Sequence, residues 1–239
     1  NVITAQYCHA AWHEARRRYR VHEGTRLDAW YQTLVGAQAV AYERRAYADP
    51  ALRAVIAVSR ITAGELTRHY GVGAGRITVV PNGADPAVFD RARYPTARQA
   101  LRHERGIAAA APVALLVGTY ARKGLDTAIA AVARASRTLH LVVAGAGDGD
   151  AARRWAAAAG MTDRLHLLGA RSDVARLYAA ADVFILPTRY EPFGMVIAEA
   201  MASALPVIVS ACSGAAELIE PGVSGCVVES ADDADAFAA

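Results

Sequence analysis

From Pro112 to the end of the chain, short apolar runs alternate with segments of helical character. The runs are rich in Val, Ile and Leu and only a few residues long, which is typical of strands buried on both faces. Strands that alternate with helices predict an α/β fold with a doubly wound parallel sheet. The predicted strands are 113–117, 139–143, 165–168, 183–186, 207–209 and 226–228. The predicted helices lie near 125–135, 150–159, 172–181, 193–204 and 214–220.

The first 83 residues predict a smaller set of the same elements. Apolar residues recur with a 3.6-residue period in the long helix, whereas the strands are short β-branched runs. The predicted strands are 1–6, 54–59 and 77–80, and the predicted helices are 27–47 and 62–70. Because three strands make about half of a doubly wound domain, we expect a preceding segment on the order of 100 residues.

The polar stretch after Gly83 marks a domain boundary, because it contains Pro86 and Pro95 and has no clear periodicity before a short helix. We therefore expect three parts. Residues 1–83 are the remnant of an N-terminal Rossmann-like domain, 84–111 are a linker with a lead-in helix, and 112–239 are a C-terminal domain whose last helix is cut. We expect the chain to be a fragment.

Composition narrows the class of protein. With 54% hydrophobic residues, 21% charged residues and a net charge of +3, the chain is too balanced for a basic nucleic-acid protein. The cysteines, Cys8, Cys212 and Cys226, are too scattered for a disulfide framework or a metal site, so a cytoplasmic protein is expected. The run 16–18 could contact membrane phosphates, but a solvated helix face is the better interpretation. Peripheral contact with the inner membrane face stays open, since the pI is near 8.9.

The segment GTYARKG after the strand 113–117 predicts an anion site. Gly118 and Gly124 allow tight turns, and Arg122 and Lys123 place two cations side by side. The next helix begins near Leu125 with its free N–H groups facing the same region. Ligands of doubly wound sheets bind at the carboxyl ends of the strands, which is where these residues lie.

Two further strand ends carry candidate residues. After the second strand, Gly145 and Gly147 would let a flat ring or a phosphate approach the backbone. Asp148 and Asp150 form a DxD pair, but no third ligand is in view, so an Asp- and Gly-rich turn explains them better than a metal does. After the third strand, Ser172 is a predicted N-cap, while Arg171 faces either solvent or the cleft.

Glu199 is the single charge between Phe193 and Val209, within a predicted helix that is apolar nearly all round. A buried carboxylate needs a hydrogen-bond partner. That partner is either a distant part of the fold or a ligand. Glu191 precedes it in a loop at the same sheet edge. Because carboxylates accept paired hydrogen bonds from vicinal hydroxyls and cations hold diphosphates, the residues together predict a nucleotide-sugar site.

Several segments resemble the family-4 retaining glycosyltransferases of the two-domain GT-B fold. The segment EPFGMVIAEA has Glu191 and Glu199 in an E-x7-E arrangement, followed by MASALPVIVS. The other matching segments, in chain order, are VIAVS, VVPNGAD followed by Phe89, GTYARKG, VVAGAGDG and AADVFILPTRYEPFG. The match runs from about Ala54 to the end of the chain.

The resemblance implies roles for individual residues. The catalytic residues would be Glu191, which contacts the donor sugar, and Arg122 and Lys123, which hold the donor diphosphate. Glu199 would bind the ribose hydroxyls. The remaining donor-binding residues would be Phe193, Gly194, Met195, Gly118, Gly145, Gly147 and Arg171.

Some positions match the family less closely. His9 corresponds only loosely to a histidine near the sugar in some members, and a structural histidine is the commoner case. Many members have Arg where this chain has Thr119, so the cationic role passes to Arg122 and Lys123. The usual pair of glycines reads Ser213-Gly214, and Asn82 and Gly83 would lie at the interdomain hinge.

The resemblance thus implies transfer of a sugar, with retention, from a UDP-, GDP- or ADP-sugar to an acceptor hydroxyl. No metal and no other cofactor is expected at the donor site, and no nucleic acid is expected as a partner. The base, the sugar and the acceptor stay open. Two alternatives also stay open: a nucleotide-sugar-binding module without turnover, and a sugar-nucleotide epimerase on the same fold.

Overall fold

The structure is a computed structural model that describes residues 1–21 and 26–239, and residues 26–30 and 32 are described by their backbone alone. The chain divides into two compact units, each described by itself. The smaller unit contains Asn1–Asn82, Tyr190–Gly194 and Ser213–Glu217, and the larger unit contains Gly83–Arg189, Met195–Cys212 and Leu218–Ala239. Among the described residues, no helix combines the length and the apolar character needed to cross a bilayer.

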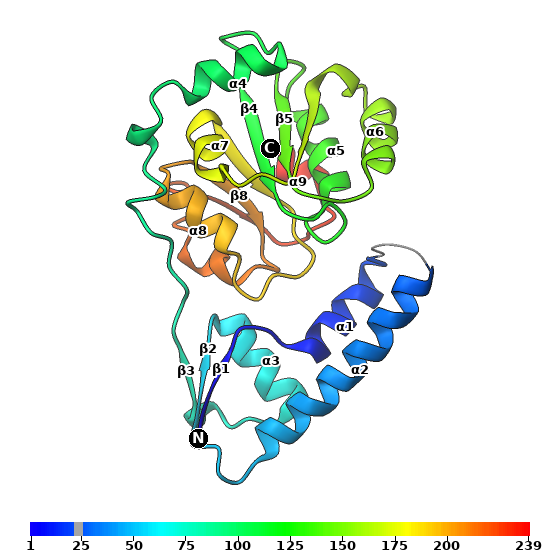
Figure 1. The fold of residues 1–239 in the computed structure, drawn as a ribbon, viewed down its shortest axis with the longest axis vertical. Coiled ribbons are helices and arrows are strands. Elements are labelled where there is room, and N and C mark those ends of the chain that lie inside the picture. Colours follow the sequence, from blue (N-terminus) through cyan, green and yellow to red (C-terminus); the bar gives the residue numbers. More distant parts are fainter. Residues whose placement is uncertain (22–25) are drawn as a thin grey trace. The chain divides into compact units, whose positions relative to one another are not determined.

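The larger unit is built on six parallel strands in the order β6-β5-β4-β7-β8-β9 (Figure 1). Their bounds are β4 (Val113–Val117), β5 (His140–Ala144), β6 (Leu165–Gly169), β7 (Val183–Leu186), β8 (Val207–Ser210) and β9 (Gly225–Val228). Every residue of the central strand β4 is buried. This burial on both faces explains why the strands read as continuous apolar runs. The predicted doubly wound parallel sheet is confirmed.

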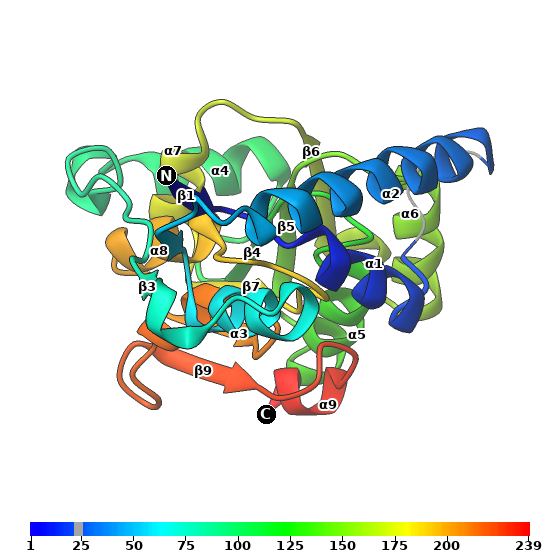
Figure 2. The ribbon, with the colours of Figure 1, turned by 90° about the horizontal axis from the view of Figure 1, so that it is seen from below.

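Helices cover both faces of this sheet. Their bounds are α4 (Ala97–Arg105), α5 (Leu125–Ala135), α6 (Gly149–Ala158), α7 (Val174–Ala180), α8 (Met195–Ala202) and α9 (Ala234–Ala238). Helix α5 packs against α6 and α9, whereas α7 packs against α4 and α8, and Figures 1 and 2 show these two groups on opposite faces of the sheet. The chain runs outward from β4 through β5 to β6 and returns to β7 on the other side of β4, so the topological switch point lies between β4 and β7.

The smaller unit contains a three-stranded parallel sheet in the order β1-β2-β3. Its elements are β1 (Val2–Ala5), α1 (His9–Arg18), α2 (Arg26–Ala48), β2 (Ala54–Ala57), α3 (Arg60–Tyr70) and β3 (Ile77–Val79). Val55, Ala57 and Leu66 are fully buried in its core. Ser59 caps α3 by accepting a hydrogen bond from the Thr62 amide, and Gly71 ends the helix in the left-handed region. The three parallel strands confirm the predicted partial N-terminal sheet.

The structure corrects two predicted helices. The helix expected at 193–204 begins at Met195, because Gly194 has a φ of 101° that an α-helix does not allow. The segment predicted as a helix over 214–220 is a 3₁₀ helix over Gly214–Leu218. Its first amides donate to the carbonyls of Glu191 and Phe193 instead of continuing an α-helix.

Candidate functional site

The carboxyl ends of β4 and β7 separate at the topological switch point. The two strands pair only at Ala114–Val183 and Leu115–Phe184, although β4 continues to Val117 and β7 to Leu186. Separation of the strands beyond these pairs leaves the following loops at the place where doubly wound sheets bind ligands.

Glycines line this edge of the sheet after β4 and β5. The Gly118 amide donates to the Ala144 carbonyl at 2.9 Å, and the Gly145 amide donates to the Gly169 carbonyl at 2.8 Å. A Cβ atom at Gly145 would lie 1.9 Å from the Gly118 carbonyl oxygen, and both glycines have positive φ. The two loops therefore pack backbone against backbone, and glycine is required at position 145.

Lys123 lies directly on Gly118. A Cβ atom at Gly118 would lie 2.7 Å from Lys123 Cε, and Lys123 is only 5% exposed. Lys123 is the only lysine among 26 basic residues in the sequence, all the others being arginine. It precedes Gly124, whose φ of 70° leads into α5. A buried ammonium group at a helix N-terminus fits an anion ligand. The half-buried Arg122 precedes it.

Glu199 lies on α8 and finds a partner within the larger unit. The Tyr178 hydroxyl on α7 donates to Glu199 Oε2 at 2.9 Å. Burial, together with the charge of Glu199, raises the pKa of Tyr178 well above its usual value, so this phenol stays a donor. Of the two kinds of partner expected for Glu199, the structure supplies one from a distant part of the fold. Met195 begins the same helix and is 38% exposed.

Tyr120 is a residue of this edge that the sequence analysis missed. Its ring lies on Gly147, where a Cβ atom would come within 2.5 Å of the ring, and its amide donates to the Ala146 carbonyl. The signal was present as an aromatic residue between Gly118 and the two cations. Asp148 serves as the N-cap of α6 by accepting from the Ala151 amide.

Arg171 is engaged by a neighbouring carboxylate. It forms paired hydrogen bonds with Asp173, both at 2.7 Å. Asp173, and not the expected Ser172, is the N-cap residue of α7, since the helix begins one residue later at Val174. Arg171 and Asp173 line a cavity of about 130 Å³ together with residues of α4 and α7.

The segment 190–194, which carries Glu191, Phe193 and Gly194, is part of the smaller unit. Glu191 is half-buried and forms an isolated β-bridge with Ser213. The Ser213 hydroxyl donates to the Phe193 carbonyl at 2.8 Å. A Cβ atom at Gly214 would lie 2.2 Å from the Pro192 carbonyl oxygen, so glycine is required there. The Ser-Gly pair thus holds the backbone that carries Glu191.

His9 is held by a carboxylate in the smaller unit. Its Nδ1 lies 2.6 Å from Glu43 Oε1, and its amide donates to Glu43 Oε2 at 3.0 Å. The Tyr70 hydroxyl donates to the same carboxylate. Glu43 therefore fixes both the orientation of the imidazole and the tautomer that carries hydrogen on Nδ1.

Glu65 and Tyr190 form a second polar group in the smaller unit. The Tyr190 hydroxyl oxygen lies 3.0 Å from the Cys8 carbonyl and 3.1 Å from Glu65 Oε2. One phenolic hydrogen cannot serve both acceptors, but a protonated Glu65 would supply the second hydrogen. Burial raises the pKa of Glu65 to about 7, which agrees with this arrangement.

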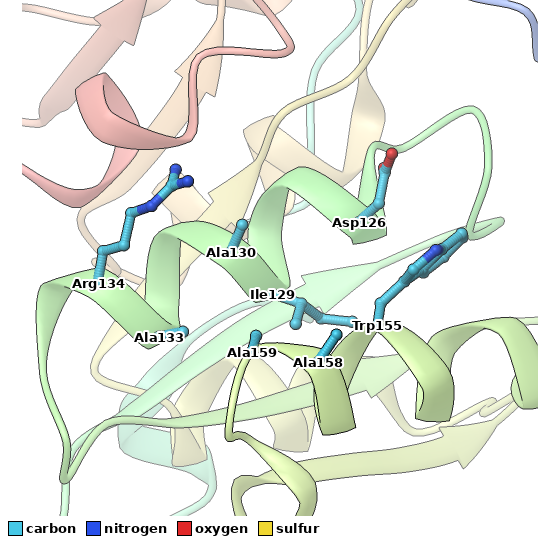
Figure 3. Close-up of a pocket in the computed structure, with 8 residues that line it drawn as sticks. All are labelled: Asp126, Ile129, Ala130, Ala133, Arg134, Trp155, Ala158 and Ala159. Atoms are coloured by element: carbon cyan, nitrogen blue, oxygen red, sulfur yellow. The ribbon is translucent and has the colours of Figure 1, made fainter.

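A groove of about 500 Å³ lies between α5 and α6 (Figure 3). Ala130, Ala133 and Trp155 line it, and Asp126 and Arg134 mark its two ends. It contains none of the predicted site residues. Within the described parts of the chain, no group of three or more His, Cys, Asp or Glu side chains is arranged to hold a metal ion.

Family models match both parts of the chain. Residues 111–239 match the model described as "Glycosyl transferases group 1", and residues 2–88 match the model described as "Glycosyltransferase Family 4". A D-inositol 3-phosphate glycosyltransferase from Xylanimonas cellulosilytica is 35% identical over 189 residues, which cover 75% of this chain and 45% of that protein. Lipopolysaccharide glucosyltransferase WaaG from Escherichia coli is 29% identical over 196 residues, which cover 79% of this chain and 52% of WaaG. The chain thus spans about half the length of the curated relatives it matches.

Solved structures share the fold. The crystal structure of WaaG aligns with a TM-score of 0.78 at 24% identity, covering 99% of this chain and 64% of WaaG. HepE from Anabaena, solved with UDP and glucose, aligns with a TM-score of 0.72 at 24% identity, covering 99% of this chain and 60% of HepE. These likenesses establish a GT-B architecture.

Proposed function

The chain belongs to the group 1 glycosyltransferases of family 4, and on this basis we propose that the protein moves a sugar from a nucleoside diphosphate sugar to an acceptor hydroxyl with retention. The complexes of HepE with UDP-glucose and with UDP and glucose support this class of donor. UDP-, GDP- and ADP-sugars are the candidate donors, and the acceptor is left open to a glycan, a lipid or a small molecule.

The observation that carries the proposal is the position of Lys123 on Gly118. The sole lysine of the chain is buried beside a glycine-lined strand end and directly before α5. In the proposed reaction the bond between the sugar and the diphosphate breaks, and the departing diphosphate gains negative charge. Lys123, Arg122 and the first amides of α5 would stabilise that charge, and such preorganised groups commonly make the largest contribution to catalysis.

The two carboxylates would bind different parts of the donor. Glu199, oriented by Tyr178, would accept hydrogen bonds from the ribose hydroxyls. Glu191 would contact the sugar, and the backbone amides of Phe193, Gly194 and Met195 would hold the sugar or the phosphates. Gly118, Gly145 and Gly147 would let the nucleotide approach the backbone, and no metal is needed for this arrangement.

Two further residues enter the proposal with smaller roles. Arg171 would lie near the base, although Asp173 already takes up its paired donors. His9 would face the sugar through the ring nitrogen that Glu43 leaves available. The basic run 16–18 could support peripheral membrane contact if the acceptor is a lipid.

Titration of the protein with UDP, GDP and ADP tests the proposal. A nucleotide present at 100 times its Kd should add about 2.7 kcal/mol to the free energy of unfolding, visible as a rise in Tm. Incubation with the matching nucleotide sugar, with product release followed by chromatography, then tests turnover. Binding followed by hydrolysis or transfer supports the enzyme, and binding without turnover supports a nucleotide-sugar-binding module. Isomerisation of the sugar without an acceptor would indicate an epimerase, and absence of binding to any nucleotide overturns the donor site.

A further inference from the structure

Arg189 joins the two loops that follow the diverging strands β4 and β7. It lies in the β7–α8 loop, two residues before Glu191, and its side chain is 11% exposed. Its Nη1 donates to the Ala121 carbonyl at 2.9 Å, in the loop that carries Arg122 and Lys123. Its Nη2 lies 2.7 Å from Asp126 Oδ2, in the first turn of α5. All of these groups lie within the larger unit.

The backbone around Arg189 reinforces the same connection. The Arg189 amide donates to the Arg122 carbonyl at 3.0 Å, and the Thr188 hydroxyl approaches the same carbonyl at 3.3 Å. A Cβ atom at Gly124 would lie 2.1 Å from the Pro187 carbonyl oxygen, so the two loops also touch at the start of α5. The strands no longer pair at this level. Hydrogen bonds from 188–189 therefore replace the missing strand pairing.

A third element meets the same guanidinium. Arg189 Nε donates to Asp232 Oδ1 at 3.1 Å, and Asp232 lies just before α9. Burial lowers the pKa of Arg189, but Asp126 and Asp232 raise it by more, so the side chain is charged at every ordinary pH. The planar guanidinium can donate in several directions at once, which a lysine ammonium cannot match in this geometry. Figure 3 shows Asp126 at the N-terminal end of α5.

We propose that Arg189 is a positioning residue that fixes the 121–124 segment, and with it Lys123, across the topological switch point. The consequence for donor binding rests on the proposed function. The positioning itself does not depend on the proposed function, because it involves only groups of this chain. Asp232 takes part in the same positioning, so the segment before α9 is coupled to the loop that carries the two cations.

The single lysine allows a direct test. Lys123 is the single lysine of the sequence, so its acetylation is followed by peptide mass spectrometry. A lysine-containing peptide added to the mixture serves as the internal reference. We expect Arg189→Gln to raise the Lys123 labelling rate relative to that reference by about fivefold or more, as expected if a segment opens locally.

Arg164→Gln is the matched control. Arg164 donates to the carbonyls of Ser136 and Leu139 at 2.9 Å, before β5 and therefore at the opposite edge of the same sheet. It should lower Tm without changing the labelling ratio. Equal ratios in Arg189→Gln and wild type, or an equal rise in both variants, overturn the proposal. If Arg189→Gln does not fold, Asp232→Asn replaces it, with a smaller rise expected and an unchanged ratio counting against the proposal.

Nucleotide affinity provides the second measurement. For whichever nucleoside diphosphate the wild type binds, Arg189→Gln should weaken binding about tenfold, whereas Arg164→Gln should leave Kd within about twofold. If the wild type binds none of them, the proposed function fails while the labelling ratio still decides the role of Arg189. A changed labelling ratio with unchanged affinity would overturn the link between the positioning and the donor site.

Discussion

The six-stranded sheet has a buried cation at the end where its strands begin, called the amino edge, and another at the end where they finish, called the carboxyl edge. The groups that surround the two cations differ. At the amino edge, Arg102 is 3% exposed and donates to the carbonyls of Ala111 and Ala180 and to Asp182. Asp182 also accepts from Arg98 and from the Val113 amide. At the carboxyl edge, Lys123 is 5% exposed and lies on Gly118. Burial of a cation is therefore no sufficient mark of a ligand site.

The difference lies in the groups around the cation. At the amino edge, Asp182 and backbone carbonyls surround Arg102 and connect the starts of β4 and β7, so removal of one of these partners should destabilise the fold. The carboxyl edge instead combines the buried Lys123 with glycines of positive φ and with the first amides of α5, which together suit an anion. Substitutions at the two edges should accordingly separate stability from ligand binding.

Lys123→Ala should have the largest effect on the reaction. If the ammonium stabilises the departing diphosphate, kcat should fall by about 10²–10³-fold, while Tm changes little. Steady-state kinetics with the cognate nucleotide sugar, compared with thermal unfolding, make the measurement. Lys123→Arg keeps the charge but should not restore kcat, because a planar guanidinium replaces the compact ammonium whose stem packs on Gly118. Full activity in Lys123→Ala would remove the cation from the mechanism.

Asp182→Asn should have the opposite profile. It weakens the pairing with Arg98 and Arg102 and leaves Arg102 buried with less compensation, which should cost about 1–2 kcal/mol of the free energy of unfolding. Nucleotide Kd should stay unchanged, since Asp182 lies at the other end of the strands. Urea unfolding and isothermal titration on the same samples measure both quantities. A large loss of affinity would show that the two edges are not independent.

Local pattern was sufficient to predict the sheet, because its strands are buried on both faces. Val113–Val117 is apolar at every position and is buried at every position. The proximity of Gly118 and Lys123 followed from the same reasoning, since both lie at the end of that strand. The resemblance to family-4 glycosyltransferases, drawn from motifs in the same order, is confirmed by the family models.

Contacts between distant segments could not be predicted in the same way. The amides of 214–215 pair with the carbonyls of Glu191 and Phe193, so apolar periodicity alone misjudged that helix. Tyr178 reaches Glu199 from the preceding helix, and Arg189 reaches Asp126 across 63 positions. Sequence reasoning selected the two carboxylates of the E-x7-E motif as candidates, and their roles stay predictions. It could not identify the groups that orient their surroundings.

Glu199→Gln and Tyr178→Phe test how two residues at the carboxyl edge contribute to nucleotide binding. Loss of the carboxylate should weaken nucleotide binding about tenfold with little change in kcat, because the ribose does not react. Tyr178→Phe removes only the orienting hydrogen bond and should weaken binding by about threefold. Calorimetric titration with the cognate nucleoside diphosphate compares them. An equal fall in kcat and affinity for Glu199→Gln would contradict this division of roles.

The smallest expected effect concerns a histidine pair at the amino edge. His140 Nδ1 lies 3.0 Å from His166 Nε2, and the rings are stacked at a centroid distance of 5.2 Å. Burial lowers the pKa of both rings, and the charges of Arg164 and Arg102 near His140 and of Arg105 near His166 act in the same direction.

The sign of the pH effect follows from proton binding. Below the ordinary histidine pKa of about 6.5, the unfolded chain takes up protons that the folded pair resists, so the free energy of unfolding falls as pH decreases through that range. His140→Gln should therefore lose less Tm than the wild type between about pH 7.5 and about pH 5.5. His103→Gln, at an exposed position of α4, is the control and should follow the wild-type curve. Nucleotide binding should be the same in all three proteins at neutral pH, because the pair lies at the amino edge, at the opposite end of the strands from Lys123. A pH dependence of Tm in His140→Gln as steep as that of the wild type would place the acid sensitivity elsewhere in the fold.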